Sequence, residues 1–115
     1  MDQDGNIFAH ISVALSEKEQ VDELLARPGV MIERIVSKGH ASAPGFWYEQ
    51  DWDEWVIVLA GEARLRFEEE KDARTLAAGD YVFIPANARH RVDWTKPDQA
   101  TVWLAVHFGR EGRAG

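Results

Sequence analysis

Short apolar segments bounded by turn residues run through most of the chain. They alternate with the period of two that is typical of strands, or are apolar on both faces, and glycine, proline, asparagine and aspartate separate them. This spacing predicts an antiparallel sandwich or barrel. We expect an extended arm or first strand at 6–15, a hairpin of 54–60 and 62–68 around Gly61, and further strands at 30–38, 46–50, 75–77, 81–84, 89–94 and 101–108.

One segment follows the helical period instead. Ser16-Glu17-Lys18-Glu19 has the form of a capping box, and Val21, Leu24 and Leu25 then form one apolar stripe. Pro28-Gly29 would end such a helix. The pattern therefore predicts one short helix near residues 17–26.

Two strands are predicted to be apolar on both faces. Trp55, Ile57 and Leu59 would point outward from 54–60, and the strand at 101–108 is apolar throughout its middle. An antiparallel sheet that faces water should alternate, and an uncovered apolar patch usually marks an interface. We therefore expect a homodimer that packs sheet against sheet.

Length and composition narrow the class of protein. The 115 residues suit one domain, and no cysteine is available for disulfides or thiol chemistry. The formal charge of −7 makes nucleic acid an unfavourable partner and leaves no polybasic patch for a membrane. The longest apolar run, 55–60, is too short to span a bilayer, and the acidic N-terminus lacks the basic region of a signal peptide. We expect a cytoplasmic protein.

Two residues carry candidate chemistry. Glu54 shares its strand face with Val56 and Val58, where an ionised carboxylate is costly to bury without a metal, a cationic partner or a proton. The alternative is that Glu54 lies in water at the mouth of its strand. His90 follows a turn and shares a face with Val92 and Trp94, opposite a charged face.

Two sequence blocks resemble the cupin superfamily. Gly79, Pro85, Asn87 and His90 match the second cupin motif, Gly-x5-Pro-x-Gly-x2-His-x3-Asn, with asparagine at the second glycine and Trp94 at the final asparagine. Glu54-x6-Gly61 matches the end of the first motif. The His-x-His pair of that motif is missing, since the residues before Glu54 read Trp47-Tyr48-Glu49-Gln50.

The resemblance implies a double-stranded β-helix jelly roll. With the helix predicted from the apolar stripe, we expect an all-β domain with one short N-terminal helix. The domain would span 1–115, with the barrel core at about 30–108 and the arm and helix at 1–29. Of the family's metal ligands, Glu54 and His90 survive. A three-residue spacer would place Tyr48 and Gln50 in the other two positions, and a four-residue spacer would place Trp47 and Glu49 there. We favour Tyr48 and Gln50, because both offer oxygen whereas an indole only donates.

A small-molecule pocket would surround these residues. Its expected walls are Trp47, Val56, Phe83, Trp94 and Trp103. His40, in a loop, could fold over the barrel mouth. His107, on the last strand, is either a core histidine or a substitute ligand.

Two functions follow from this interpretation. The first is a metal-dependent enzyme acting on a small organic molecule, either a dioxygenase or an isomerase or lyase, that uses iron, zinc, manganese or nickel. The second is a non-catalytic binding or sensing module without metal, in which Glu54 and His90 hydrogen-bond each other. No nucleophile elbow or phosphate-binding glycine loop occurs in the sequence.

Overall fold

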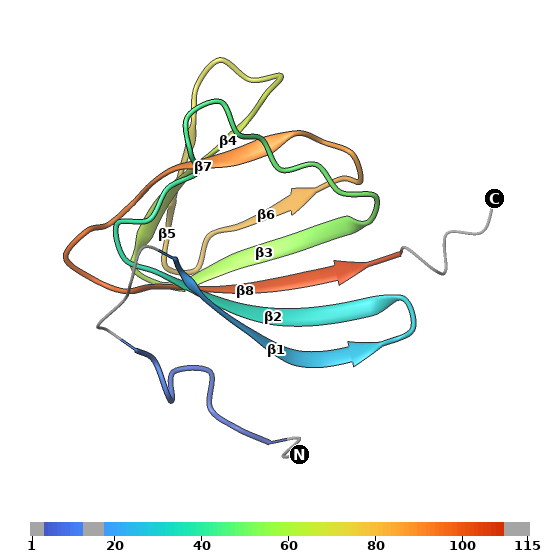
Figure 1. Cartoon of the computed structure of the whole chain (residues 1–115), viewed down its shortest axis with the longest axis vertical. Coiled ribbons are helices and arrows are strands. Elements are labelled where there is room, and N and C mark those ends of the chain that lie inside the picture. The colour runs from blue at the N-terminus through green and yellow to red at the C-terminus, as the bar shows by residue number, and fades with distance from the viewer. Residues whose placement is uncertain (1–3, 13–17, 110–115) are drawn as a thin grey trace.

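Two antiparallel sheets face each other in the computed structural model, which describes residues 4–12 and 18–109 (Figure 1). The five-stranded sheet has the order β1 (Gln20–Arg27), β2 (Val30–Ser37), β8 (Thr101–Phe108), β3 (Asp53–Ala60) and β6 (Tyr81–Ile84). The three-stranded sheet has the order β5 (Arg74–Ala77), β4 (Glu62–Phe67) and β7 (His90–Thr95). The all-β prediction is therefore confirmed. None of the described residues forms a helix that could cross a membrane.

Alternating side chains of both sheets fill the space between them. Every second residue of β4 and β6 is buried, and so is every second residue of β3 from Glu54 to Val58, as the sequence pattern predicts for strands with one covered face. The resulting core is formed by Val56, Val58, Ala63, Leu65, Phe67, Leu76, Val82, Ile84, Trp103 and Ala105.

The predicted helix near 17–26 is wrong, because residues 20–27 form the edge strand β1. Val21 pairs with Ile35 of β2, and a bulge between Glu23 and Leu25 leaves Leu24 without a partner residue. The extra residue shifts the apolar positions and imitates a helical stripe. Pairing with β2 outweighs the local helical preference. Ser16 and Glu17 of the expected capping box lie outside the described residues.

The predicted hairpin at Gly61 is also wrong. β3 pairs with β8 and β6, whereas β4 pairs with β5 and β7, so the chain changes sheets at Gly61. Gly61 has φ of 87°, and a Cβ there would lie 2.4 Å from Thr101 Oγ1. Glycine is required at this corner for its conformation and its lack of a side chain.

The aromatic segment at 46–50 does not form a full strand. It makes one bridge to β7, in which Tyr48 N donates to His90 O at 2.7 Å and His90 N donates to Tyr48 O at 3.1 Å. Asn87 N also donates to Gln50 O at 2.6 Å. These bonds hold the segment beside the start of β7.

Candidate functional site

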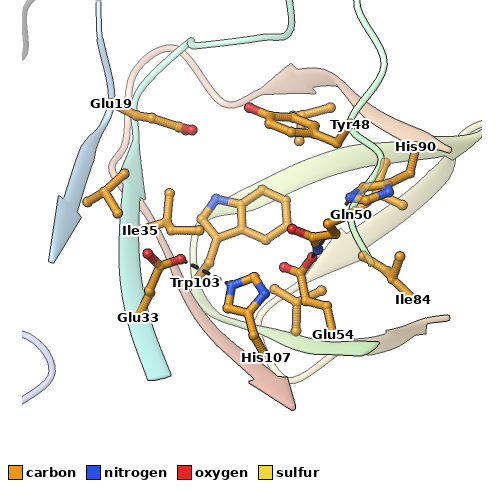
Figure 2. A pocket seen from close by; sticks show the side chains of 14 residues that line it. Glu19, Glu33, Ile35, Tyr48, Gln50, Glu54, Ile84, His90, Trp103 and His107 are labelled. Atoms are coloured by element: carbon orange, nitrogen blue, oxygen red, sulfur yellow. Dashed lines mark hydrogen bonds and ion pairs between the residues drawn. The ribbon is translucent and has the colours of Figure 1, made fainter. Parts of the chain in front are cut away.

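A cavity of about 230 Å³ opens between the two sheets (Figure 2). Strands of both sheets supply its apolar surface, which includes Val56 and Ile84 of the five-stranded sheet and Leu65 and Val92 of the three-stranded sheet. The Trp103 indole spans its centre. Its polar lining residues are Glu19, Glu33, Tyr48, Gln50, Glu54, His90 and His107. The volume is below the usual range for drug-sized ligands, so the cavity suits a small molecule.

Glu54 points into this cavity from the start of β3. Strand alternation places it on the same face as Val56, and its exposed fraction is 8%. Gln50 Nε2 donates a 2.6 Å hydrogen bond to Glu54 Oε1. The carboxylate is thus buried and held by an amide, rather than solvated at a strand mouth.

His90 faces Glu54 from the first position of β7. The preceding turn contains Asn87 at φ 67°, a conformation that asparagine tolerates better than most residues. His90 Nδ1 lies 2.9 Å from Ala88 O, and this carbonyl only accepts, so Nδ1 carries the proton. In the neutral ring, Nε2 therefore presents a lone pair, 3.8 Å from Glu54 Oε1.

The structure places Tyr48 and Gln50 at the cavity, and Trp47 and Glu49 away from it. The Tyr48 ring stacks on His90 with centroids 5.6 Å apart. Burial, then the charges of Glu19 and Glu54, raise the pKa of Tyr48, so its phenol stays protonated at neutral pH. Glu49 forms an ion pair with Arg89 at 3.9 Å.

His107 and Glu33 form a second carboxylate–imidazole pair that our sequence interpretation did not include. His107 Nε2 lies 3.1 Å from Glu33 Oε1, and a carboxylate only accepts, so Nε2 donates. His107 is 6% exposed, and its Nδ1 is buried without a hydrogen-bond partner among the described residues. Figure 2 shows the ring between Glu33 and Glu54, which is the cross-strand partner of His107. The Trp52 ring stacks on the imidazole of His107, with ring centroids 5.0 Å apart.

The alternation that located Glu54 could also have located Glu33. Glu33 and Ile35 share the inward face of β2, so the same cost of burying a carboxylate applied there. Glu19 had no such signal, because it was assigned to a helix. It accepts a 2.6 Å hydrogen bond from Ser37 Oγ, which in turn accepts one from Trp103 Nε1 at 3.2 Å.

Three expected pocket walls lie outside the cavity. Phe83 points outward because Val82 and Ile84 occupy the inward positions of β6, and it is 50% exposed. A bulge in β7 pairs Trp94 with Arg64 and turns it to the outer face, where the guanidinium lies 4.7 Å from the ring centroid. Trp47 also packs against arginines, with Arg66 at 5.0 Å from its ring centroid.

The expected loop histidine, His40, lies beside the cavity rather than in it. It lines a neighbouring hollow with Ser42, Tyr48 and Val92. Its Nδ1 accepts a hydrogen bond from Lys38 N at 2.9 Å. In this position His40 is not among the groups that face Glu54 and His90.

The donor set at Glu54 does not fit a resident transition metal. Among the described residues, no group of three His, Cys, Asp or Glu side chains is arranged to hold one. Glu54 and His90 offer two ligands, but Gln50 turns its NH₂ group toward the carboxylate and Tyr48 keeps its proton. Catalytic zinc and non-haem iron sites use three protein ligands.

The two facing sheets and the inward-facing site define a jelly-roll domain with an internal pocket. Residues 33–107 match the family model for the cupin domain, so the chain belongs to the cupin family. A crystal structure from Ralstonia eutropha, of a candidate mannose-6-phosphate isomerase, is 47% identical, with 91% of this chain and 96% of that chain covered and a TM-score of 0.88. A search of curated proteins gave no match.

More distant crystal structures share the fold alone. A cupin superfamily protein from Desulfitobacterium hafniense is 17% identical, with 94% of this chain and 93% of that chain covered and a TM-score of 0.72. The DMSP lyase DddQ from Ruegeria pomeroyi is 18% identical, with 89% of this chain and 52% of that chain covered and a TM-score of 0.68.

Proposed function

We propose that this protein is an enzyme of the isomerase or lyase kind that binds a small organic molecule in its cavity and moves a proton on it. The observation that carries the proposal is the Glu33–His107 pair. A carboxylate holds one ring nitrogen, and the other is buried with no hydrogen-bond partner in the part of the chain that the structure describes. A general base needs this arrangement, because a fixed tautomer keeps one lone pair free.

The second imidazole supports the same function. His90 donates Nδ1–H to a backbone carbonyl and presents its Nε2 lone pair to the cavity. Two proton acceptors attached to different sheets could serve two positions of one substrate. Tyr48, held protonated, supplies a proton donor beside His90.

Hydrogen exchange into a bound substrate would test this function. We would incubate the protein in D₂O with small hydroxy, oxo and amino compounds, including mannose 6-phosphate, and follow the loss of C–H signals by NMR. We expect at least one compound to exchange, and we expect His107→Gln to slow that exchange by about 100-fold or more, the usual contribution of a general base. The exposed His10→Gln variant is the control and should exchange at the wild-type rate.

The outcome also separates the enzyme from a non-catalytic module. A compound that binds in the cavity and never exchanges would support a binding or sensing role. Exchange at the wild-type rate in both His107→Gln and His90→Gln would contradict the residue assignment.

A metal-dependent enzyme is the second candidate, favoured by the lone pairs of His90 and Glu54 that converge 3.8 Å apart. Iron, zinc, manganese or nickel would have to recruit Gln50 or Tyr48 as a further ligand, because Glu54 and His90 alone supply only two. A calorimetric titration of chelator-treated protein with each of these metals would test the metal site. We would compare wild type with Glu54→Gln, His90→Ala and His107→Ala. Binding that is weakened by the first two variants and kept by the third would support a metal site, and binding unchanged in His90→Ala would contradict it.

A further inference from the structure

Hydrogen-bond acceptors dominate the polar surface of the cavity. Glu19, Glu33 and Glu54 present carboxylates, which only accept when ionised. Each already receives one hydrogen bond, from Ser37, His107 and Gln50 respectively, and keeps further acceptor capacity.

The two imidazoles add further acceptors. Because Nδ1 of His90 and Nε2 of His107 carry the ring protons, the opposite nitrogens are lone pairs in the neutral rings. The lone pair of His107 is buried, and no described residue donates to it. A buried acceptor without a hydrogen bond is costly in free energy, so this lone pair indicates that a donor is missing from the cavity.

No lysine or arginine among the described residues lines the cavity, so no such positive side chain balances these groups. An anion would face three carboxylates inside a poorly solvated space, where charges interact more strongly than in water. A cation would be attracted by the same groups. The Trp103 ring at the centre of the cavity offers a face on which a cation is further stabilised.

We propose that the molecule bound here is a small organic cation with N–H donors, that is, a protonated primary or secondary amine. The inference rests on the proposed function, since it names the ligand class of the same cavity. The charge provides the attraction to Glu33 and Glu54. The N–H group donates to one of the two imidazole lone pairs and leaves the other for proton transfer. A cavity of about 230 Å³ is smaller than the usual pocket for a drug-sized ligand, which limits the amine to a short chain or single ring.

A cavity that binds an amine cation should not bind a sugar phosphate. A phosphate monoester carries nearly two negative charges at neutral pH and is bound in proteins by arginine, lysine or helix N-termini. Within residues 4–12 and 18–109, none of these lines the cavity. We therefore expect mannose 6-phosphate not to compete with an amine here.

Matched ligands that differ in charge test the proposal. We would titrate chelator-treated protein with butylamine, butanol and butyrate, and then with benzylamine, benzyl alcohol and benzoate, following backbone amide shifts by NMR and Kd by calorimetry. In each set we expect the amine to bind at least about tenfold more tightly than the alcohol, and the carboxylate not to bind. Glu33→Gln and Glu54→Gln should each weaken the amine by about tenfold or more, since each removes a charge-assisted acceptor. The control variant Glu49→Gln lies outside the cavity and should leave the Kd of the amine unchanged.

Several results would overturn the proposal. If alcohols or carboxylates bind at the cavity residues as tightly as amines, the ligand class is wrong while the small-molecule function survives. If no organic compound of any charge perturbs the cavity, both fail. If zinc alone shifts the cavity residues and amines do not, the acceptors serve a metal ion instead.

Discussion

Arg34 is a buried cation that ties the N-terminal arm to the five-stranded sheet. Its guanidinium donates to the carbonyl oxygens of Ile7, Ala9 and His10, and its Nε and Nη2 donate to Asp22 Oδ2 at 3.0 and 2.6 Å. Arg34 is 5% exposed, so each of these acceptors compensates for its lost hydration.

The Asp22–Arg34 pair should contribute to acid sensitivity. Burial would raise the pKa of Asp22, but hydrogen bonds from Arg34 and Gln20 and the charge of Arg34 outweigh it and lower the pKa. Because the pKa is lower in the folded state, the ionised carboxylate stabilises the fold at pH values above its unfolded-state pKa of about 3.9. This stabilisation is lost as the pH falls through the folded-state pKa.

We therefore expect Asp22→Asn to destabilise the protein by about 1 kcal/mol at neutral pH, a small value because solvent screens the 37%-exposed carboxylate. The difference from wild type should shrink below about pH 4. Urea unfolding across the pH range would measure both effects, with the exposed Asp72→Asn as control. A difference from wild type that persists unchanged at acid pH would contradict the assignment.

Single residues were predictable where strand alternation was regular. Glu54 was found from the sequence because it shares a strand face with valines. His90 was found because it lies on an apolar face after a turn and matches the second cupin motif, and the structure places both at the cavity. Glu33 carried the same signal in its strand. Its role emerges only from its contact with His107, 74 positions away in the chain. A pairing of that range is set by sheet order, which local periodicity does not contain.

Elements were predicted less well wherever a bulge or a change of sheet interrupts the pattern. The strand at 101–108 was predicted with its observed bounds, because nothing breaks its apolar run. The bulge in β1 imitated a helix, and the bulge in β7 moved Trp94 to the outer face. Each adds one residue to a strand, and one residue reverses every side chain that follows.

The corner at Gly61 gives an element-scale prediction. An alanine there would meet backbone atoms of Ala100 and Thr101 at 2.8 and 2.6 Å, and would also have to adopt φ of 87°. We expect Gly61→Ala to lower the free energy of unfolding by about 3 kcal/mol or more, the sum of overpacking and left-handed strain.

Gly45→Ala provides the matched control for this prediction. Gly45 also has positive φ, at 78°, but an added Cβ would meet nothing within 4 Å. Its substitution should cost only the strain of about 1–2 kcal/mol. Equal losses in the two variants, measured by urea unfolding, would show that the close approach at Thr101 is unimportant.

At the scale of the molecule, we propose that the outer face of the five-stranded sheet forms a homodimer interface. Tyr81 and Phe83 of β6 are 65% and 50% exposed, and the ring of Tyr81 lies against Trp55 of β3 and that of Phe83 against Phe108 of β8. β3 lies between β8 and β6 in one sheet, so the aromatic residues form a continuous apolar surface.

Light scattering should therefore give twice the chain mass at micromolar concentration. Tyr81→Glu with Phe83→Glu should shift the mass toward a monomer, because burying two carboxylates in an apolar interface is unfavourable. Phe46→Glu, at a similarly exposed position in the loop beside β7, should remain dimeric. A wild-type monomer would rule out this assembly.

Proton transfer in the cavity depends most on the free lone pairs of the two imidazoles that line it. NMR that correlates the ring nitrogens with their ring protons distinguishes the tautomers directly and requires no ligand. At alkaline pH, where both rings are neutral, we predict opposite tautomers, with the proton on Nδ1 in His90 and on Nε2 in His107. A spectrum with the proton on His107 Nδ1 would remove the base that faces the substrate and would contradict the proposed function.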